Sequence, residues 1–90
     1  MIREPQYEVG AEEVLDQLEA GSDESLLNAV VDAIELILDR GDEPEARRKM
    51  VTGENGQDWF EVRVRDSRHD WVIFWRPEGA VARIAYIGSF

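Results

Sequence analysis

The chain has 90 residues, no cysteine, and 20 Asp and Glu side chains against 10 Lys and Arg, for a net charge of −10. This length suits one domain, residues 1–90, with a small core that the 43% of hydrophobic residues can supply. The lack of cysteine excludes disulfide and thiolate chemistry, and no apolar run approaches the ~20 residues of a membrane span. We therefore expect a soluble, cytoplasmic protein.

The charge is unevenly distributed along the chain. Residues 1–46 contain fourteen Asp and Glu against Arg3 and Arg40, a net of −12, whereas residues 47–90 contain six against eight Lys and Arg, a net of +2. An acidic half can simply keep a small protein soluble. Segregated charge can also leave a basic surface to which phosphates bind. The sequence leaves both interpretations open.

The first half of the chain predicts a short strand and two helices. Residues 6–9 (QYEV) are typical of a strand. Apolar residues at helical spacing from Ala11 to Leu18, followed by Gly21, predict the first helix. The second helix is expected to begin near Ser22 or Asp23, either of which is a good N-cap, and to end where Arg40 precedes glycine 41.

The second helix has a narrow polar stripe, formed by Asn28, Asp32, Glu35 and Asp39 at spacings of 4, 3 and 4. Most of the remaining surface is apolar. Such a helix packs against neighbours on most of its circumference, or keeps part of its apolar surface for a partner.

The second half predicts a connector and three strands. Residues 41–57 form the connector, with one turn of helix or the start of a strand within ARRKM (residues 46–50) and a loop bracketed by Gly53 and Gly56. Residues 59–65 alternate between apolar and polar, residues 71–75 are apolar on both faces as in a central strand, and residues 81–87 follow a tight turn at Pro77 and Gly79. The predicted fold is α+β: a helical hairpin packed on a small twisted antiparallel sheet.

This order of elements resembles the RelE/ParE superfamily of small bacterial toxins. Those chains carry a string like R-V-G-D-Y-R, then an aliphatic–aromatic strand, then a final strand ending in V-G-H or similar. Here the string is RVRDSR (residues 63–68), the strand is VIFW (72–75), and the chain closes with YIGSF (86–90). The resemblance spans the whole chain. Residues His69 to Trp71 lengthen the hairpin, Arg65 and Ser67 replace the Gly and Tyr of the string, and Ser89 stands where many RNA-cleaving members have a histidine or tyrosine.

The resemblance implies a toxin of a toxin–antitoxin system that cleaves mRNA on the ribosome, and an antitoxin-like protein as partner. Attack of a ribose 2′-OH on the adjacent phosphate needs a general base, positive charge on the phosphorane and an acid for the leaving oxygen. Arginine suits phosphate oxygens, and the single histidine titrates near neutrality. The candidate catalytic residues are Arg63, Arg65, Arg68, His69 and Tyr86, and the candidate RNA-binding residues are Arg47, Arg48, Lys49, Trp59 and Arg83.

Each candidate also has a simpler interpretation. Arg63 and Arg65 are what the solvent face of a strand displays, His69 suits a hairpin turn, and Arg68 with Asp70 can form a surface pair. Trp59 shares its predicted face with the two strand arginines. That mixture stacks bases and holds phosphates, but it also forms protein-interface hot spots.

No cofactor is expected, and no metal site, because the single histidine has no second imidazole or thiolate to cooperate with. The alternative function is a non-catalytic interaction domain on the same fold. In that case the acidic half contacts a basic protein as a mimic of nucleic acid or as an inhibitor.

Overall fold

The structure is a computed structural model that describes residues 2–53 and 55–89. Strand β1 (Glu4–Tyr7) leads into helices α1 (Val9–Ala20) and α2 (Glu24–Arg40). A short 3₁₀ helix, η1 (Pro44–Ala46), precedes β2 (Lys49–Thr52). Strands β3 (Asp58–Arg63), β4 (Trp71–Glu78) and β5 (Val81–Ser89) complete the chain. The α+β class is confirmed.

The five strands form one mixed sheet in the order β1-β5-β4-β3-β2. The prediction of a purely antiparallel sheet is wrong, because β1 pairs in parallel with β5, from Glu4 opposite Val81 to Tyr7 opposite Ile84. The two helices between β1 and the meander provide the crossover that a parallel pair requires. The other pairings are antiparallel. Strand β4 is central, as its apolar character predicted.

Several predicted boundaries shift. The first strand ends at Tyr7 and helix α1 already begins at Val9, so the predicted strand over residues 6–9 is placed too late. Pro77 lies within β4 opposite Ala82, and the hairpin turns at Gly79, whose φ of 63° favours glycine. The predicted start of a strand within residues 46–50 is present as β2, whereas the helical turn η1 lies earlier and reaches only Ala46 of that range.

The residues that cap the two ends of α2 are among those that the sequence predicted. The Asp23 side chain accepts a hydrogen bond from the Leu26 N–H, and Gly41 is the C-cap. A β-carbon at Gly41 would lie 2.6 Å from the Ile37 carbonyl and 2.9 Å from the Trp75 ring, so this position admits only glycine without a shift. The polar stripe of α2 is exposed along its whole length.

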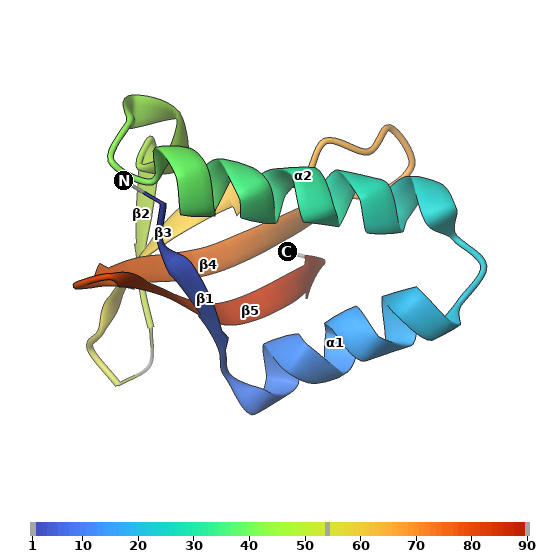
Figure 1. The fold of residues 1–90 in the computed structure, drawn as a ribbon, viewed down its shortest axis with the longest axis horizontal. Helices are drawn as coiled ribbons and strands as arrows, with labels where there is room; N and C mark the ends of the chain where they lie inside the picture. Colours follow the sequence, from blue (N-terminus) through green and yellow to red (C-terminus); the bar gives the residue numbers. More distant parts are fainter. Residues whose placement is uncertain (1, 54, 90) are drawn as a thin grey trace.

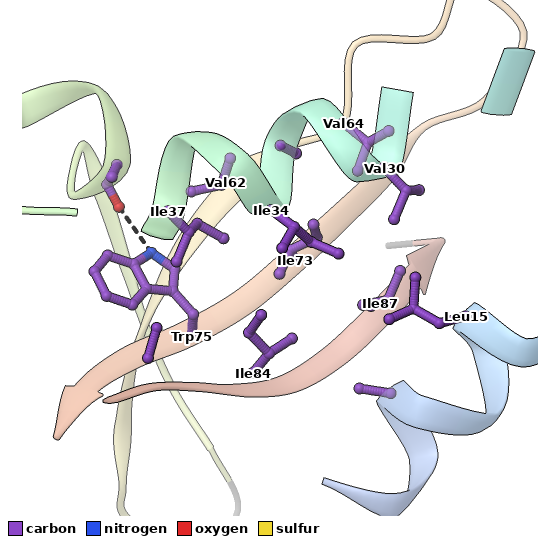
Figure 2. Packing of buried hydrophobic residues seen from close by; sticks show 14 of the residues in the cluster. Leu15, Val30, Ile34, Ile37, Val62, Val64, Ile73, Trp75, Ile84 and Ile87 are labelled. Atoms are coloured by element: carbon purple, nitrogen blue, oxygen red, sulfur yellow. Dashed lines mark hydrogen bonds between the residues drawn. The ribbon is translucent and has the colours of Figure 1, made fainter. Parts of the chain in front are cut away.

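Both helices pack on the same face of the sheet, α1 against β5 and α2 across β3 and β4 (Figure 1). The core lies between these layers (Figure 2). Its largest member is Trp75, which is fully buried and donates a hydrogen bond from Nε1 to the Ala46 carbonyl at 3.0 Å, dashed in Figure 2. The helices and strands contribute Leu15, Val30, Ile34, Ile37, Val62, Ile73, Ile84 and Ile87, and Val64 joins them from just after β3.

We expect Trp75→Phe to destabilise the fold by about 1–3 kcal/mol, because it leaves the buried Ala46 carbonyl without its donor, with a further loss from the smaller ring. Urea unfolding followed by circular dichroism measures this change. The control is Trp71→Phe, since within the described residues the indole N–H of the half-buried Trp71 donates no hydrogen bond. Equal losses in the two variants would show that the Trp75 hydrogen bond is not a specific contributor.

Candidate anion-binding groove

Arg63 and Arg65 lie where three adjoining hollows of the surface meet. The first, about 360 Å³, runs between α2, η1 and the start of β2. The second, about 320 Å³, continues along α2, and the third, about 410 Å³, extends over the turn after β3. We call the first two hollows together the β3–α2 groove. It is lined by Ala29, Asp32, Ala33, Leu36, Glu45, Arg48, Lys49, Glu61, Val62, Arg63 and Arg65.

The groove exists because β2 covers only part of β3. Strand β2 begins at Lys49, opposite Glu61, so β3 has no strand neighbour on that side at Arg63. The Val64 N–H donates to the Trp71 carbonyl across the β3–β4 ladder. Because the amides of an antiparallel strand point alternately to its two sides, the backbone of Arg63 faces away from β4, towards the groove.

The arginines of the groove are the ones without a carboxylate partner. Seven of the ten basic side chains form ion pairs, namely Arg3, Arg40, Arg47, Lys49, Arg68, Arg76 and Arg83. Among the residues that the structure describes, Arg48, Arg63 and Arg65 form no ion pair and no side-chain hydrogen bond. All three are exposed, and all three line the groove. The groove also contains the carboxylates of Asp32, Glu45 and Glu61, of which Glu45 is paired with Arg40 and Glu61 with Lys49. The three arginines therefore leave a net positive charge there, as an anion site requires.

Glu61 also lines the first hollow, but the strand register places its side chain beside Phe74, on the face of the sheet opposite the helices. Its side chain is 7% exposed, its Oε2 lies 3.5 Å from Lys49 Nζ on the neighbouring strand, and its Oε1 has no hydrogen-bond partner among the described residues. The sequence analysis did not select this residue. The available signal was an acidic residue in the middle of a strand, facing a lysine across the pairing of β2 with β3.

Arg68 and His69 belong to a turn that is fastened to the start of α2 (Figure 1). Arg68 Nη2 lies 2.9 Å from Asp23 Oδ1, and the Ser25 hydroxyl donates to Asp66 Oδ2 at 3.1 Å. The His69 ring contacts Asp66 through Nδ1 at 3.3 Å and lines the third hollow beside Arg63 and Arg65. His69 therefore borders the arginine cluster, whereas Arg68 is held in a structural ion pair.

The remaining candidates lie elsewhere. Arg47 is half-buried on the helix side of the sheet, where its Nε donates to the Gly41 carbonyl and its guanidinium lies over Trp75 and Phe60, 5.7 and 5.1 Å from the ring centroids. Trp59 and Arg83 lie on the face of the sheet opposite the helices, and the alternation along β3 assigns Arg63 to that face too, at the edge that β2 does not cover.

On that opposite face Trp59 is only 8% exposed, with the Arg76 guanidinium 4.9 Å from its ring centroid. Arg83 is paired with Glu78, which lowers the pKa of that carboxyl. Tyr86 stacks on Phe74 and donates to the Ser89 carbonyl, in the same cross-strand row as Glu61. The register places Val72 and Phe74 on this face and Trp71 and Trp75 on the helix side.

Within residues 2–53 and 55–89, no three His, Asp or Glu side chains gather to hold a metal ion. None of the helices described is long and apolar enough to cross a membrane. Comparisons with known protein families, curated proteins and solved structures found no match to this chain.

The Asp66 carboxylate, in the turn after β3, should make the stability of the fold depend on pH. The Arg68 backbone N–H, with the His69 and Ser25 side chains, lowers the pKa of Asp66 in the folded protein. A lowered pKa means that the ionised carboxylate stabilises the fold above the unfolded-state pKa of about 4, and that this contribution is lost as pH falls through the folded-state pKa. We expect Asp66→Asn to be less stable than the parent at pH 7 and to lose less stability between pH 5 and 2.

Urea unfolding at each pH measures both effects. Asp70→Asn is the matched control, because Asp70 is exposed in the same turn and within the described residues its carboxylate forms no ion pair. If the free energy of unfolding of Asp66→Asn falls between pH 5 and 2 as steeply as that of the parent, the ionised Asp66 carboxylate does not stabilise the fold.

Proposed function

We propose that the chain is a RelE/ParE-type toxin that binds RNA in the β3–α2 groove and acts on it as an endoribonuclease. The observation that carries this proposal is the gathering along one groove of Arg48, Arg63 and Arg65, which form no ion pair with any residue that the structure describes. The order of a strand, two helices and a closing meander also supports it, because it is the order on which the resemblance was drawn.

The chemistry of the groove suits a polyanion with closely spaced charges. Arginine offers a planar fork of donors that matches phosphate oxygens, and three such groups along one channel can follow a single-stranded backbone. The same positive charge would stabilise a phosphorane when the 2′-oxygen attacks. His69 borders the third hollow beside Arg63 and Arg65 and is the candidate for proton transfer there.

The proposal includes an antitoxin-like protein partner and action in the cytoplasm, where ribosomes and mRNA are found. Exposed apolar side chains on the helices and at the sheet edge are compatible with a protein partner. They are Val9, Val31 and Met50.

RNA binding should depend on the unpaired arginines. We expect single-stranded RNA to bind with a log–log salt slope near −2, about −0.7 for each of three neutralised phosphates. Arg63→Ala with Arg65→Ala should weaken binding at low salt and flatten the slope by about 1.4. Fluorescence anisotropy across a salt series measures both.

Arg83→Gln is the control for charge, since it removes a basic residue that is paired with Glu78 outside the groove. Its salt slope should equal that of the parent. If Arg83→Gln flattens the slope as much as the double variant, RNA is held on the other face of the sheet.

Expression of the chain alone in bacteria should arrest growth, and the double variant Arg63→Ala, Arg65→Ala should grow normally, because RNA can no longer be held for cleavage. Colony counts after induction, with protein levels matched, measure this. Normal growth of the parent together with no RNA affinity would favour the acidic interaction domain, whose exposed stripe on α2 would then be the contact surface.

A further inference from the structure

Besides its arginines, the β3–α2 groove contains an open strand edge. Strand β2 pairs with β3 only as far as Lys49 opposite Glu61, and in the described part of the chain no other strand lies on that side of β3 at Arg63. The Val64 N–H donates to the Trp71 carbonyl, so Arg63, one residue earlier, directs its N–H and C=O away from β4. We call this the open edge of β3. An edge of this kind is a template for another strand.

The backbone of the open edge is only partly complementary to a phosphate chain. Arg63 offers one donor, its N–H, and one acceptor, its C=O, on the same side of the strand. The oxygens of an ionised phosphodiester only accept hydrogen bonds, so a phosphate leaves this carbonyl to water. An extended peptide has a donor and an acceptor on each residue and pairs with both groups of Arg63 at once. The open edge therefore suits a protein segment.

The arginines around the open edge determine the charge of that segment. Arg63 is exposed on the face of the sheet opposite the helices, Arg65 lines the same hollows two residues later, and Arg48 comes immediately before β2. None of the three forms an ion pair with a described residue. In a strand added to β3, the residue directly opposite Arg63 has its side chain on the same face as Arg63. A Glu or Asp at that position meets the guanidinium.

The next residue of the added strand points to the helix side of the sheet, because side chains alternate along a strand. There the wall of the groove is α2, which contributes the half-buried Ala29 and Leu36 as apolar surface. The same wall carries the carboxylates of Asp32 and Glu45, which repel a further acidic side chain. A segment that fits both sides therefore alternates acidic and apolar residues.

We propose that an extended segment of a partner protein, with acidic and apolar residues in alternation, adds to the open edge of β3 at Arg63 as an antiparallel strand in line with β2. This inference gives the protein partner of the proposed function a binding surface and a chemistry. One consequence rests on that function: the bound segment occupies the arginines and keeps RNA out of the β3–α2 groove. The contact between segment and groove does not depend on RNA binding.

The test uses labelled synthetic peptides and the full chain. The probe has the central sequence Glu-Val-Glu-Val-Glu, and a matched peptide has the same composition with its glutamates adjacent, Val-Glu-Glu-Glu-Val. We expect the alternating peptide to bind about tenfold or more tightly, because only this peptide places carboxylates on one face of a strand and apolar side chains on the other. Fluorescence anisotropy gives the affinities.

Methylation of the peptide backbone tests the hydrogen bonds to the open edge. N-methylation of the glutamates removes the donors that face β3 and should weaken binding about tenfold or more. N-methylation of the valines is the control, since their amides face away from β3, and it should leave the affinity nearly unchanged. Hydrogen exchange gives an independent measurement, because the Arg63 amide should become protected when the peptide binds.

Variants of the protein test the charge. Arg63→Ala with Arg65→Ala, shown to be folded by circular dichroism, should bind the alternating peptide about tenfold or more weakly than the parent. Arg83→Gln should bind it as the parent does, because Arg83 is paired with Glu78 outside the groove.

The outcomes separate this inference from the proposed function. Equal affinities for the alternating and matched peptides, or equal weakening by the two methylations, overturn the strand addition and leave a groove that binds negative charge alone. Binding that is unaffected by the loss of Arg63 and Arg65 also overturns it. If the alternating peptide binds as expected and no RNA binds, the strand addition stands and the proposed function fails. If both bind and the peptide does not displace RNA, the shared site is wrong.

Discussion

The hydrogen bond from Trp75 Nε1 to the Ala46 carbonyl determines where the connector meets the sheet. Both residues are fully buried. Arg47 strengthens the junction by donating to Gly41 at the end of α2 and by lying over the Trp75 ring. Because residues 46 and 47 are held against the core, the chain first pairs with β3 at Lys49. The part of β3 that stays uncovered, and therefore the groove, follows from this one anchor in the core.

The charged side chains fall into two groups, those that connect elements of the fold and those that remain available on the surface. Asp42 joins Arg3 and Arg47 where the N-terminal segment meets the end of α2, and Glu78 joins Arg76 and Arg83 across the β4–β5 hairpin. Asp23 joins the turn after β3 to the start of α2. These carboxylates form ion pairs that hold different elements of the fold together. The chain is strongly acidic as a whole, yet Arg48, Arg63 and Arg65 line one groove and form no ion pair with the described part of the chain. Net charge is thus a poor guide to the local surface in this molecule.

The hydrophobic periodicity and the residues that cap helices or form turns predicted most of the fold, because both reflect local conformational preferences. The stripe on α2, the caps at Asp23 and Gly41, and the alternation along β3 all appear in the structure. The parallel pairing of β1 with β5 was missed, because local preferences indicate a strand but not which distant strand it pairs with. For the site, the sequence selected Arg63 and Arg65 but also Arg47 and Arg83. Only the fold shows which arginines meet a carboxylate or a ring. Glu61 was overlooked because its burial depends on Lys49 and on how far β2 extends.

The proposed RNA contact is with Arg48, Arg63 and Arg65 in the groove and not with Arg76 and Arg83, which are paired with Glu78. Nitrogen-15 NMR of the arginine Nε–Hε groups during titration with a short single-stranded RNA tests it most directly. We expect the Arg48, Arg63 and Arg65 signals to shift together with one affinity, while those of Arg76 and Arg83 stay in place because Glu78 already binds them. Shifts at Arg76 and Arg83 with none at Arg63 and Arg65 would contradict it.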